Sequence, residues 1–259
     1  NGPFTFAPDG NPLVGPVPGL RNFWAACGCM GGFSQGGAIG KVLSEWIVEG
    51  DPGTDIFGMD VARYGKFAAA DRYLLDTTAQ FYARRFVIAY PNEELPAGRP
   101  LKTTPSYEVQ KALGARFGVV WGMESPQYFA TGEPDFVEPP TLRRSTAERF
   151  VAAEVAATRA AAGLLDTGVY ARYEVRGPGA GRWLDHLLAS RLPAVGRIRL
   201  APMLNPAGRL MGDLTVTRLD EDRYWLVGSY YLQEWHLRWF HDHLPAAGVE
   251  IENLSESWL

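Results

Sequence analysis

The sequence predicts an α+β fold whose sheet is mainly antiparallel and covered by helices. Residues 196–229 contain three successive strand-like runs, and Asn205-Pro206-Ala207-Gly208 separates the first two. Proline and glycine supply the backbone geometry of a turn there, so the two runs are expected to pair as a hairpin. Helical patterns flank strand-like runs throughout residues 101–259, an order typical of the α+β class.

Periodicity and stop signals place the individual elements. An amphipathic helix is predicted from about Ala38 to Val48, because a glycine and a proline follow it. Gly163 likewise ends a long helix that begins near Thr146. The other expected helices are 69–86, 180–188 and 233–244, and the expected strands are 23–26, 173–176, 203–204, 214–216, 224–229 and 249–253.

Composition excludes several classes of protein. The chain has 259 residues, of which 46% are hydrophobic and 21% charged, so a sizeable core is expected rather than disorder. Its net charge of -4 gives no electrostatic case for nucleic acid or an anionic membrane as partner. No apolar run approaches the roughly 20 residues that span a bilayer, and no secretory leader is present, so we expect a cytoplasmic protein. Because residue 1 is asparagine rather than methionine, we expect a fragment of a longer protein.

Cysteine and histidine usage predicts neither a disulfide nor a metal centre. Cys27 and Cys29 are separated by one residue, which is too close for an ordinary disulfide, and both are expected to be buried thiols. His236, His241 and His243 lie in one predicted helix. His241 and His243 point apart on that helix, and no further ligand pattern completes a closed site, so we predict that they bind no metal.

A glycine-rich run precedes the first predicted helix. Gly31, Gly32, Gly36 and Gly37 surround Ser34 in this run. Such a turn lets backbone N–H groups at a helix N-terminus approach an anionic or polar ligand closely. The same pattern is also typical of a structural loop.

Asp213 stands at the head of the Leu-Thr-Val run that forms the second strand of the predicted hairpin. Carboxylates are depleted from strands. Asp213 is therefore either a solvated residue at the end of a strand or a placed functional group.

Residues 1–57 combine a PDGNPLVG entry, a GGFSQGG turn and an LSEWIVEG helix. In this combination the segment resembles the C-terminal FAD-contacting part of the glycine oxidase/D-amino-acid oxidase flavoprotein superfamily. The resemblance implies that Gly31, Gly32, Ser34, Gly36 and Gly37 contact FAD. No GxGxxG pattern follows a first strand, so FAD binding is expected to need N-terminal residues outside this sequence.

Residues 58–100 carry the stretches DVARYG and YPNEELPAGRP. They resemble the linker of the dimethylglycine and sarcosine dehydrogenase family, which joins a flavin domain to a folate domain. The domain boundaries expected on this basis are 1–57, 58–100 and 101–259.

Residues 101–259 resemble the first part of the aminomethyltransferase (glycine cleavage T-protein) fold. Trp121, Glu124, Pro126 and Tyr128 carry the entry motif of that fold, and MLNPAGRLMGD carries its folate-binding hairpin. The resemblance implies a tetrahydrofolate site. Its expected residues are Asp213 as the catalytic carboxylate and Tyr170, Met203, Leu204, Val227 and Ser229 around the pterin.

The chain departs from this family pattern at three glycines. Gly168, Gly212 and Gly228 stand where relatives often have serine, aspartate and asparagine. The site is therefore expected to keep one acid instead of two. Asp166 matches the acid of a family loop, with a local cap as the alternative role.

The resemblances together imply part of an oxidoreductase that depends on FAD and tetrahydrofolate. Such an enzyme demethylates a small N-methyl amine and passes the one-carbon unit to tetrahydrofolate, with an electron-transfer partner or oxygen as electron acceptor. The fragment alone is expected to be inactive in the oxidation step. The alternatives are a non-catalytic scaffold and a stand-alone folate-dependent aminomethyltransferase or demethylase.

Overall fold

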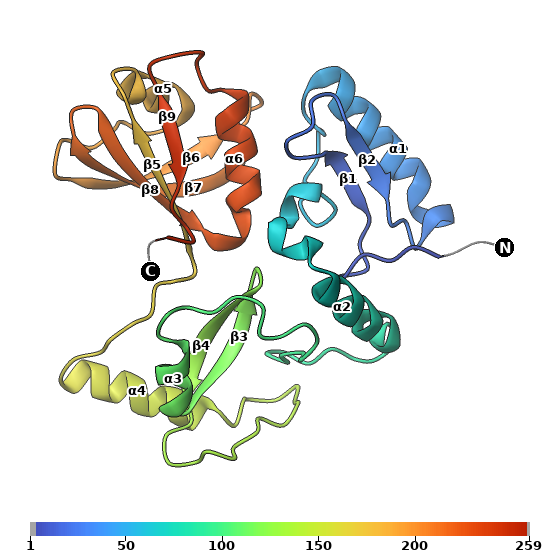
Figure 1. The fold of residues 1–259 in the computed structure, drawn as a ribbon, viewed down its shortest axis with the longest axis vertical. Helices are drawn as coiled ribbons and strands as arrows, with labels where there is room; N and C mark the ends of the chain where they lie inside the picture. Colours follow the sequence, from blue (N-terminus) through green and yellow to red (C-terminus); the bar gives the residue numbers. More distant parts are fainter. Residues whose placement is uncertain (1–3, 258–259) are drawn as a thin grey trace. The chain divides into compact units, whose positions relative to one another are not determined.

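A computed structural model describes residues 4–257 of the chain. The contacts within the chain divide it into two compact units, residues 1–165 and residues 166–259 (Figure 1). Helices and antiparallel strands occur in both units, which confirms the predicted α+β class. Within residues 4–257, no helix has the length and apolar character needed to cross a membrane.

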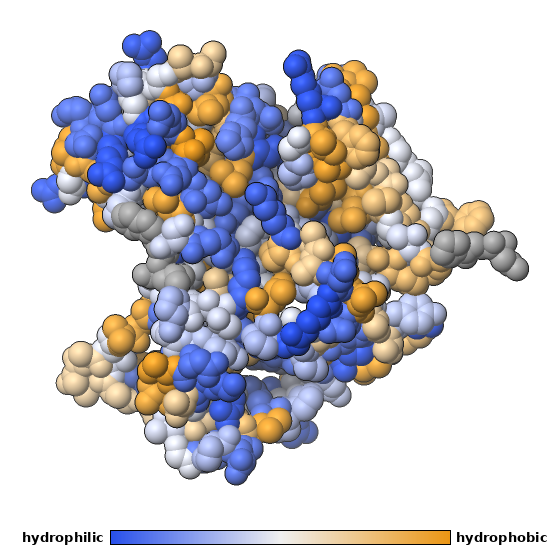
Figure 2. Space-filling view, in the orientation of Figure 1, coloured by the Kyte–Doolittle hydropathy of each residue, from blue (hydrophilic) through white to orange (hydrophobic). Residues whose placement is uncertain are grey.

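The first unit begins with a small two-stranded sheet under a helix. β1 (Leu13–Pro16) pairs antiparallel with β2 (Trp24–Cys27), and α1 (Gly32–Glu49) follows. Trp46 of α1 packs so closely on β1 that a Cβ at Gly15 would lie 2.6 Å from its ring, and the backbone φ of Gly15 is +118°. Only glycine meets both conditions. Figure 2 shows orange, hydrophobic side chains on the surface of this region.

The start of α1 corrects the sequence analysis. The helix begins at Gly32 instead of Ala38, so the glycine-rich run forms its first turns. Each glycine inside a helix costs up to about 1 kcal/mol, which is why the pattern favoured a turn. Burial of Ile39 and Trp46 further along α1 supplies the packing that intrinsic propensity lacks.

The cysteines also differ from expectation. Cys27 is exposed and Cys29 is half-buried, and neither forms a disulfide. β2 is half-exposed along its length, so a small residue on it is not shielded from solvent.

Two short 3-10 helices, Val61–Arg63 and Lys66–Ala69, lead into α2 (Asp71–Arg84). Further on are α3 (Tyr107–Ala112), the hairpin of β3 (Ala115–Val120) with β4 (Met123–Phe129), and α4 (Glu148–Ala160). The hairpin turn places Trp121 and Gly122 at φ of 51° and 78°. Positive φ at both central residues fits the two-residue turns that match the twist of paired strands.

Two arginines tie distant segments of the first unit together. Arg63 is buried and donates from Nε and Nη2 to the two carboxylate oxygens of Asp9, at 2.7 and 3.0 Å. Arg99 binds the buried Glu124 in the same two-point manner, at 2.9 and 2.6 Å. Such bidentate pairs fix orientation as well as distance.

The second unit is a five-stranded antiparallel sheet in the order β6-β7-β8-β5-β9. Its strands are β5 (Tyr170–Arg176), β6 (Ile198–Leu204), β7 (Leu210–Asp220), β8 (Arg223–Ser229) and β9 (Glu250–Asn253). Its helices are α5 (Ala180–Leu187), the 3-10 helix Tyr230–Leu232, and α6 (Gln233–Asp242). These elements confirm the strands and helices expected over residues 170–253.

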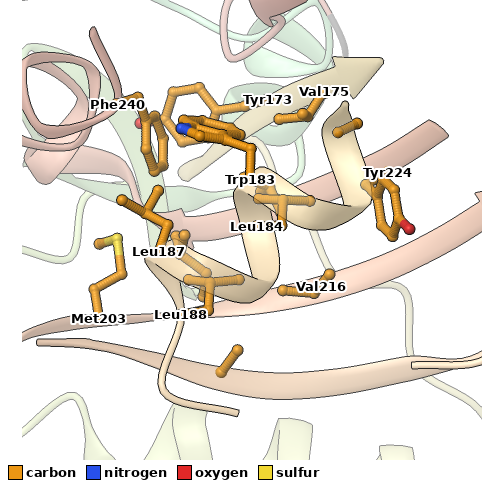
Figure 3. Packing of buried hydrophobic residues seen from close by; sticks show 14 of the residues in the cluster. Tyr173, Val175, Trp183, Leu184, Leu187, Leu188, Met203, Val216, Tyr224 and Phe240 are labelled. Carbon is orange, nitrogen blue, oxygen red and sulfur yellow. The ribbon is translucent and has the colours of Figure 1, made fainter. Parts of the chain in front are cut away.

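One face of this sheet is buried beneath α5 and α6. Tyr173, Leu184 and Phe240 belong to a single core cluster that draws residues from both helices and from four of the strands (Figure 3). Because successive side chains of a strand point to opposite faces, the residues between the core positions lie on the other face. We call that second face the open face, since Ile198 and Leu200 on it are 65% and 61% exposed.

Register and alternation define the residues of the open face. They are Tyr170, Arg172, Glu174 and Arg176 of β5, Ile198, Leu200 and Pro202 of β6, Asp213, Thr215 and Thr217 of β7, and Arg223, Trp225, Val227 and Ser229 of β8.

We predict that Leu184→Ala destabilises the second unit by about 2–5 kcal/mol, because the side chain is fully buried and its loss leaves a cavity. Leu210→Ala is the matched control on an exposed strand position and is expected to change the free energy of unfolding by less than about 0.5 kcal/mol. Urea unfolding followed by circular dichroism measures both. Equal effects of the two substitutions would contradict the placement of the core.

Candidate functional site

Three predicted site residues lie in one row across the open face. Tyr170 of β5 is the pairing partner of Ser229 of β8. Counting two residues along each strand from the Thr215–Val227 pair brings Asp213 beside Ser229. The backbone oxygen of Asp213 lies 3.6 Å from a Cβ built on Gly228, which agrees with this count.

Val227 stands one step behind that row on the same face. It pairs with Thr215 of β7 on one side and with Arg172 of β5 on the other. The structure therefore brings together Asp213, Ser229, Tyr170 and Val227. The result is a surface that combines a hydroxyl, an aromatic ring and an aliphatic side chain with one carboxylate.

Met203 is not part of this surface. It is fully buried, pairs with Gly212 and belongs to the core cluster beneath α5 and α6. Its neighbour Pro202 pairs with Asp213 on the open face, so the two-residue period of β6 turns Met203 to the opposite face. The expectation that Met203 walls the same site as Asp213 was wrong for this reason.

Leu204 is half-buried at the end of β6, where it pairs with Leu210. A register irregularity between Met203 and Leu204 separates it from the regular alternation of the strand. The structure thus puts Leu204 at the hairpin end of the sheet rather than in the Asp213 row.

Asp213 is the fourth residue of β7, not its first, and its side chain is exposed. Among residues 4–257, no lysine, arginine or histidine forms an ion pair with it. The carboxylate oxygens thus remain available as hydrogen-bond acceptors for a ligand.

Two glycines shape the strands directly before the site residues. Gly228 precedes Ser229, and a Cβ at Gly228 would lie 2.7 Å from Leu214 Cδ2 and 3.0 Å from His236 Cε1. Gly212 precedes Asp213, with His236 Nε2 at 3.8 Å from its built Cβ. The core therefore contacts the backbone immediately beneath the site.

His236 is a buried core residue. Its Nδ1 lies 3.1 Å from the hydroxyl of Tyr173, and burial lowers its pKa to about 4, so the imidazole is neutral at physiological pH. The part of the chain that the structure describes contains no cluster of three or more histidine, cysteine or acidic residues placed to hold a metal.

The far end of the open face holds a buried carboxylate that the sequence analysis did not single out. Glu174 Oε2 accepts hydrogen bonds from Nε and Nη2 of Arg223, at 3.0 and 2.7 Å, and from Nε1 of Trp225 at 2.9 Å. Arg176 Nη1 lies 3.4 Å from Glu174 Oε1. The hydrogen bonds from Arg223 hold the pKa of Glu174 below its usual range. The available signal was a glutamate at the centre of an alternating strand, flanked by arginine.

Asp166 acts within its own loop. Its Oδ1 accepts a hydrogen bond from the backbone N–H of Gly168 at 2.7 Å. This contact corresponds to the local capping role, which was the alternative expected for Asp166.

The aromatic residues of the entry motif pack within the first unit. Trp121 donates from Nε1 to the backbone oxygen of Arg63 at 3.0 Å and meets Phe67 edge to face. Tyr128 stacks on Phe150 with ring centroids 6.0 Å apart. Both contacts are structural packing.

The glycines expected to contact FAD lie at the N-terminal end of α1. Gly31 is the N-cap, and Ser34 Oγ donates to its backbone oxygen at 2.9 Å. A Cβ built on Gly32, Gly36 or Gly37 meets no atom within 4 Å. The helix backbone is therefore accessible to a flat ligand or another chain segment, which fits contact with one part of a flavin.

Comparison with known proteins shows which protein families the sequence of this chain matches. Residues 106–259 match the model described as "GCVT N-terminal domain", and residues 49–104 match "FAD dependent oxidoreductase central domain". Mitochondrial dimethylglycine dehydrogenase of Rattus norvegicus is 32% identical over 259 residues, covering 99% of this chain and 30% of the relative. The chain thus spans less than a third of the length of that relative.

Two further relatives differ in kind. The mitochondrial pyruvate dehydrogenase phosphatase regulatory subunit of Mus musculus is 27% identical and covers 95% of this chain and 29% of the relative. The crystal structure of glycine cleavage system aminomethyltransferase T from Bartonella henselae matches with a TM-score of 0.49 and 26% identity, covering 60% of this chain and 38% of that one.

We expect Glu174→Gln to lower the melting temperature at pH 7 by a few degrees, and we expect this deficit to shrink in acid. The folded-state pKa of Glu174 is lowered, so its carboxylate contributes stability above the unfolded value of about 4.3 and loses that contribution as pH falls through the folded value. Thermal unfolding at pH 7, 5 and 3 measures the difference between variant and parent.

Glu221→Gln is the matched control, because Glu221 pairs with Arg218 in solvent and such pairs contribute little. A deficit for Glu174→Gln that stays constant over this pH range would show that charge is not its cause.

Proposed function

The chain belongs to the GCVT N-terminal domain family, and on that premise we propose that its second unit binds tetrahydrofolate on the open face. The observation that carries the proposal is the row of Asp213, Ser229 and Tyr170, with Val227 behind it. A flat ring placed there contacts an aromatic side chain, a hydroxyl and a carboxylate.

The residues fit the chemistry of a reduced folate. When bound, tetrahydrofolate supplies a nucleophilic secondary amine that takes up a one-carbon unit. The exposed carboxylate of Asp213 would accept a hydrogen bond from that amine and would offset positive charge on it. Tyr170 and Val227 cover the apolar surface of the ring.

For the whole protein we propose an FAD- and tetrahydrofolate-dependent N-methyl amine dehydrogenase or oxidase of the dimethylglycine or sarcosine type. Support comes from the 32% sequence identity with dimethylglycine dehydrogenase, in an alignment that covers 99% of this chain. The match of residues 49–104 to the flavin oxidoreductase model also supports it. In this proposal Gly31, Gly32, Ser34, Gly36 and Gly37 contact FAD held mainly by another region. The one-carbon unit of the N-methyl amine passes to tetrahydrofolate, and the electrons pass to oxygen or to an electron-transfer partner. A cytoplasmic location stays a prediction.

A regulatory subunit without catalysis is the second candidate. It is favoured by the relative from Mus musculus, whose name describes a regulatory subunit and which covers 95% of this chain. The two candidates differ in whether the chain responds to folate and flavin.

Anaerobic titration of the chain with tetrahydrofolate tests the folate site. We expect saturable binding by calorimetry, accompanied by a change in fluorescence, since Trp225 lies on the open face. Asp213→Ala should weaken binding by about tenfold or more, because it removes a charge-assisted hydrogen bond. Asp185→Ala removes an exposed acid on α5 and is the matched control. Binding that is equal in both variants would exclude Asp213 from the site.

The flavin contact is tested in the full-length protein. Gly36→Leu is expected to lower bound flavin several-fold while leaving helix α1 folded, because a Cβ at this exposed position has open space around it and leucine is a better helix former. Gly58→Leu, at another exposed glycine with open space around it, should keep the flavin. Flavin absorbance and its bleaching by dimethylglycine or sarcosine are the readouts. A full-length protein without flavin would favour the regulatory candidate.

A further inference from the structure

The arginines of the open face fall into two electrostatic groups. Arg223 pairs with Glu174 at 2.7 Å. Arg176 has three carboxylates around it, those of Glu174, Glu250 and Glu252 at 3.4, 2.9 and 3.5 Å. In contrast, no carboxylate among residues 4–257 lies within ion-pair distance of Arg172. Among the described residues Arg172 therefore has no direct carboxylate partner, and the charge of Asp166 acts on it only from beyond ion-pair distance.

Neutral acceptors hold Arg172 in place. Its Nη1 donates to the backbone oxygen of Tyr170 at 3.2 Å, and its Nη2 donates to the backbone oxygen of Thr167 at 2.5 Å. Backbone carbonyls orient the guanidinium without cancelling its charge. A guanidinium has five N–H donors in a planar fork, so donors remain for a ligand.

The pKa values reflect the same difference. Burial lowers the pKa of Arg172, although the charge of Asp166 acts in the opposite direction. The carboxylates around them raise the pKa of Arg176 and Arg223. A half-buried cation that lacks a directly paired carboxylate is costly, and a bound anion would offset that cost.

Arg172 occupies the right position on the sheet relative to Asp213. It pairs with Val227, one step from the row that contains Tyr170 and Ser229. Two strand spacings of about 4.8 Å and a step of two residues put the Cα atoms of Arg172 and Asp213 on the order of 12 Å apart. Ser229 and Val227 of β8 lie between them, and Tyr170 flanks Arg172 on β5. The open face thus presents a carboxylate and a cation, separated by the hydroxyl of Ser229 and the aliphatic side chain of Val227, with the ring of Tyr170 at the side.

We propose that Arg172 is a further binding residue of the site and that it holds a carboxylate of the ligand whose amine lies at Asp213. The inference rests on the proposed folate function and names the part of the ligand involved. In tetrahydrofolate an aminobenzoyl group and one amide bond separate the amine from the glutamate carboxylates. This flat spacer suits the surface of Val227 and Ser229 beside the ring of Tyr170, and the planar fork of arginine suits a carboxylate.

The test compares two ligands in three forms of the chain. The ligands are tetrahydrofolate and a tetrahydropterin that lacks the aminobenzoylglutamate tail. The forms are the parent chain, Arg172→Gln, and Arg199→Gln as a control that removes an exposed arginine from the other side of the sheet. Calorimetry under anaerobic conditions, at low and at high salt, gives the dissociation constants.

We expect Arg172→Gln to weaken the binding of tetrahydrofolate about tenfold or more and to leave the affinity for the tetrahydropterin unchanged. The salt dependence of tetrahydrofolate binding should also decrease in this variant. If the tetrahydropterin binds too weakly to measure, this change in salt dependence tests the inference in its place. Arg199→Gln should match the parent chain. Arg172→Lys keeps the charge without the fork and is expected to restore part of the affinity.

Several results would overturn the inference. Tetrahydrofolate binding by Arg172→Gln with unchanged affinity and salt dependence would show that Arg172 holds no carboxylate. Equal weakening of both ligands would show that Arg172 acts through the fold of the site. Absence of tetrahydrofolate binding in the parent chain would instead remove the proposed function, and the inference with it. Unfolding midpoints of all variants separate loss of binding from loss of folding, and Arg172→Lys replaces Arg172→Gln if the latter does not fold.

Discussion

The burial of one face of the five-stranded sheet under α5 and α6 determines which side chains of the second unit are available on its other face. Tyr173, Val216 and Leu226 point into that core, so their neighbours along each strand must point away from it. The buried face supplies the hydrophobic contribution to the stability of this unit. The side chains of the open face do not pack in the core, so the core does not determine which residues stand there. Asp213 lies on the open face because Leu214 is buried.

The core and the open face are nevertheless linked through the backbone. Gly228 allows Leu214 and His236 to contact the strand directly beneath Ser229, and any side chain at this position would displace one of them. His236 is in turn fixed by the hydroxyl of Tyr173 on β5. The spacing of the strands that carry Asp213 and Ser229 thus depends on residues that no ligand on the open face can reach.

Local signals were enough to predict most elements but not the residues that meet across the sheet. Turn residues and period predicted the β6–β7 hairpin and the helices α2, α4, α5 and α6. The start of α1 was wrong because packing of Trp46 outweighs the poor helix propensity of glycine. Met203 was assigned to the site because it is near Asp213 in the sequence motif, whereas the register puts the two on opposite faces. The environment of Glu174 could not be read from local sequence, since its partners on β8 and β9 are about fifty to eighty residues away.

The distribution of charge on the open face follows from that register. Glu174, Glu250 and Glu252 gather around Arg176 and Arg223, so the charges at one end of the face are paired within the protein. Asp213 and Arg172 lack ion pairs among residues 4–257, and they stand on opposite sides of β8, with Val227 and Ser229 between them. Unpaired charges of opposite sign at a fixed separation favour one orientation of a ligand that carries both a donor amine and a carboxylate, because the reversed orientation places like charges together. Selection of orientation on this face therefore needs no enclosed pocket. It would follow from which acids and arginines the sheet pairs with each other and which it leaves without an ion pair among the described residues.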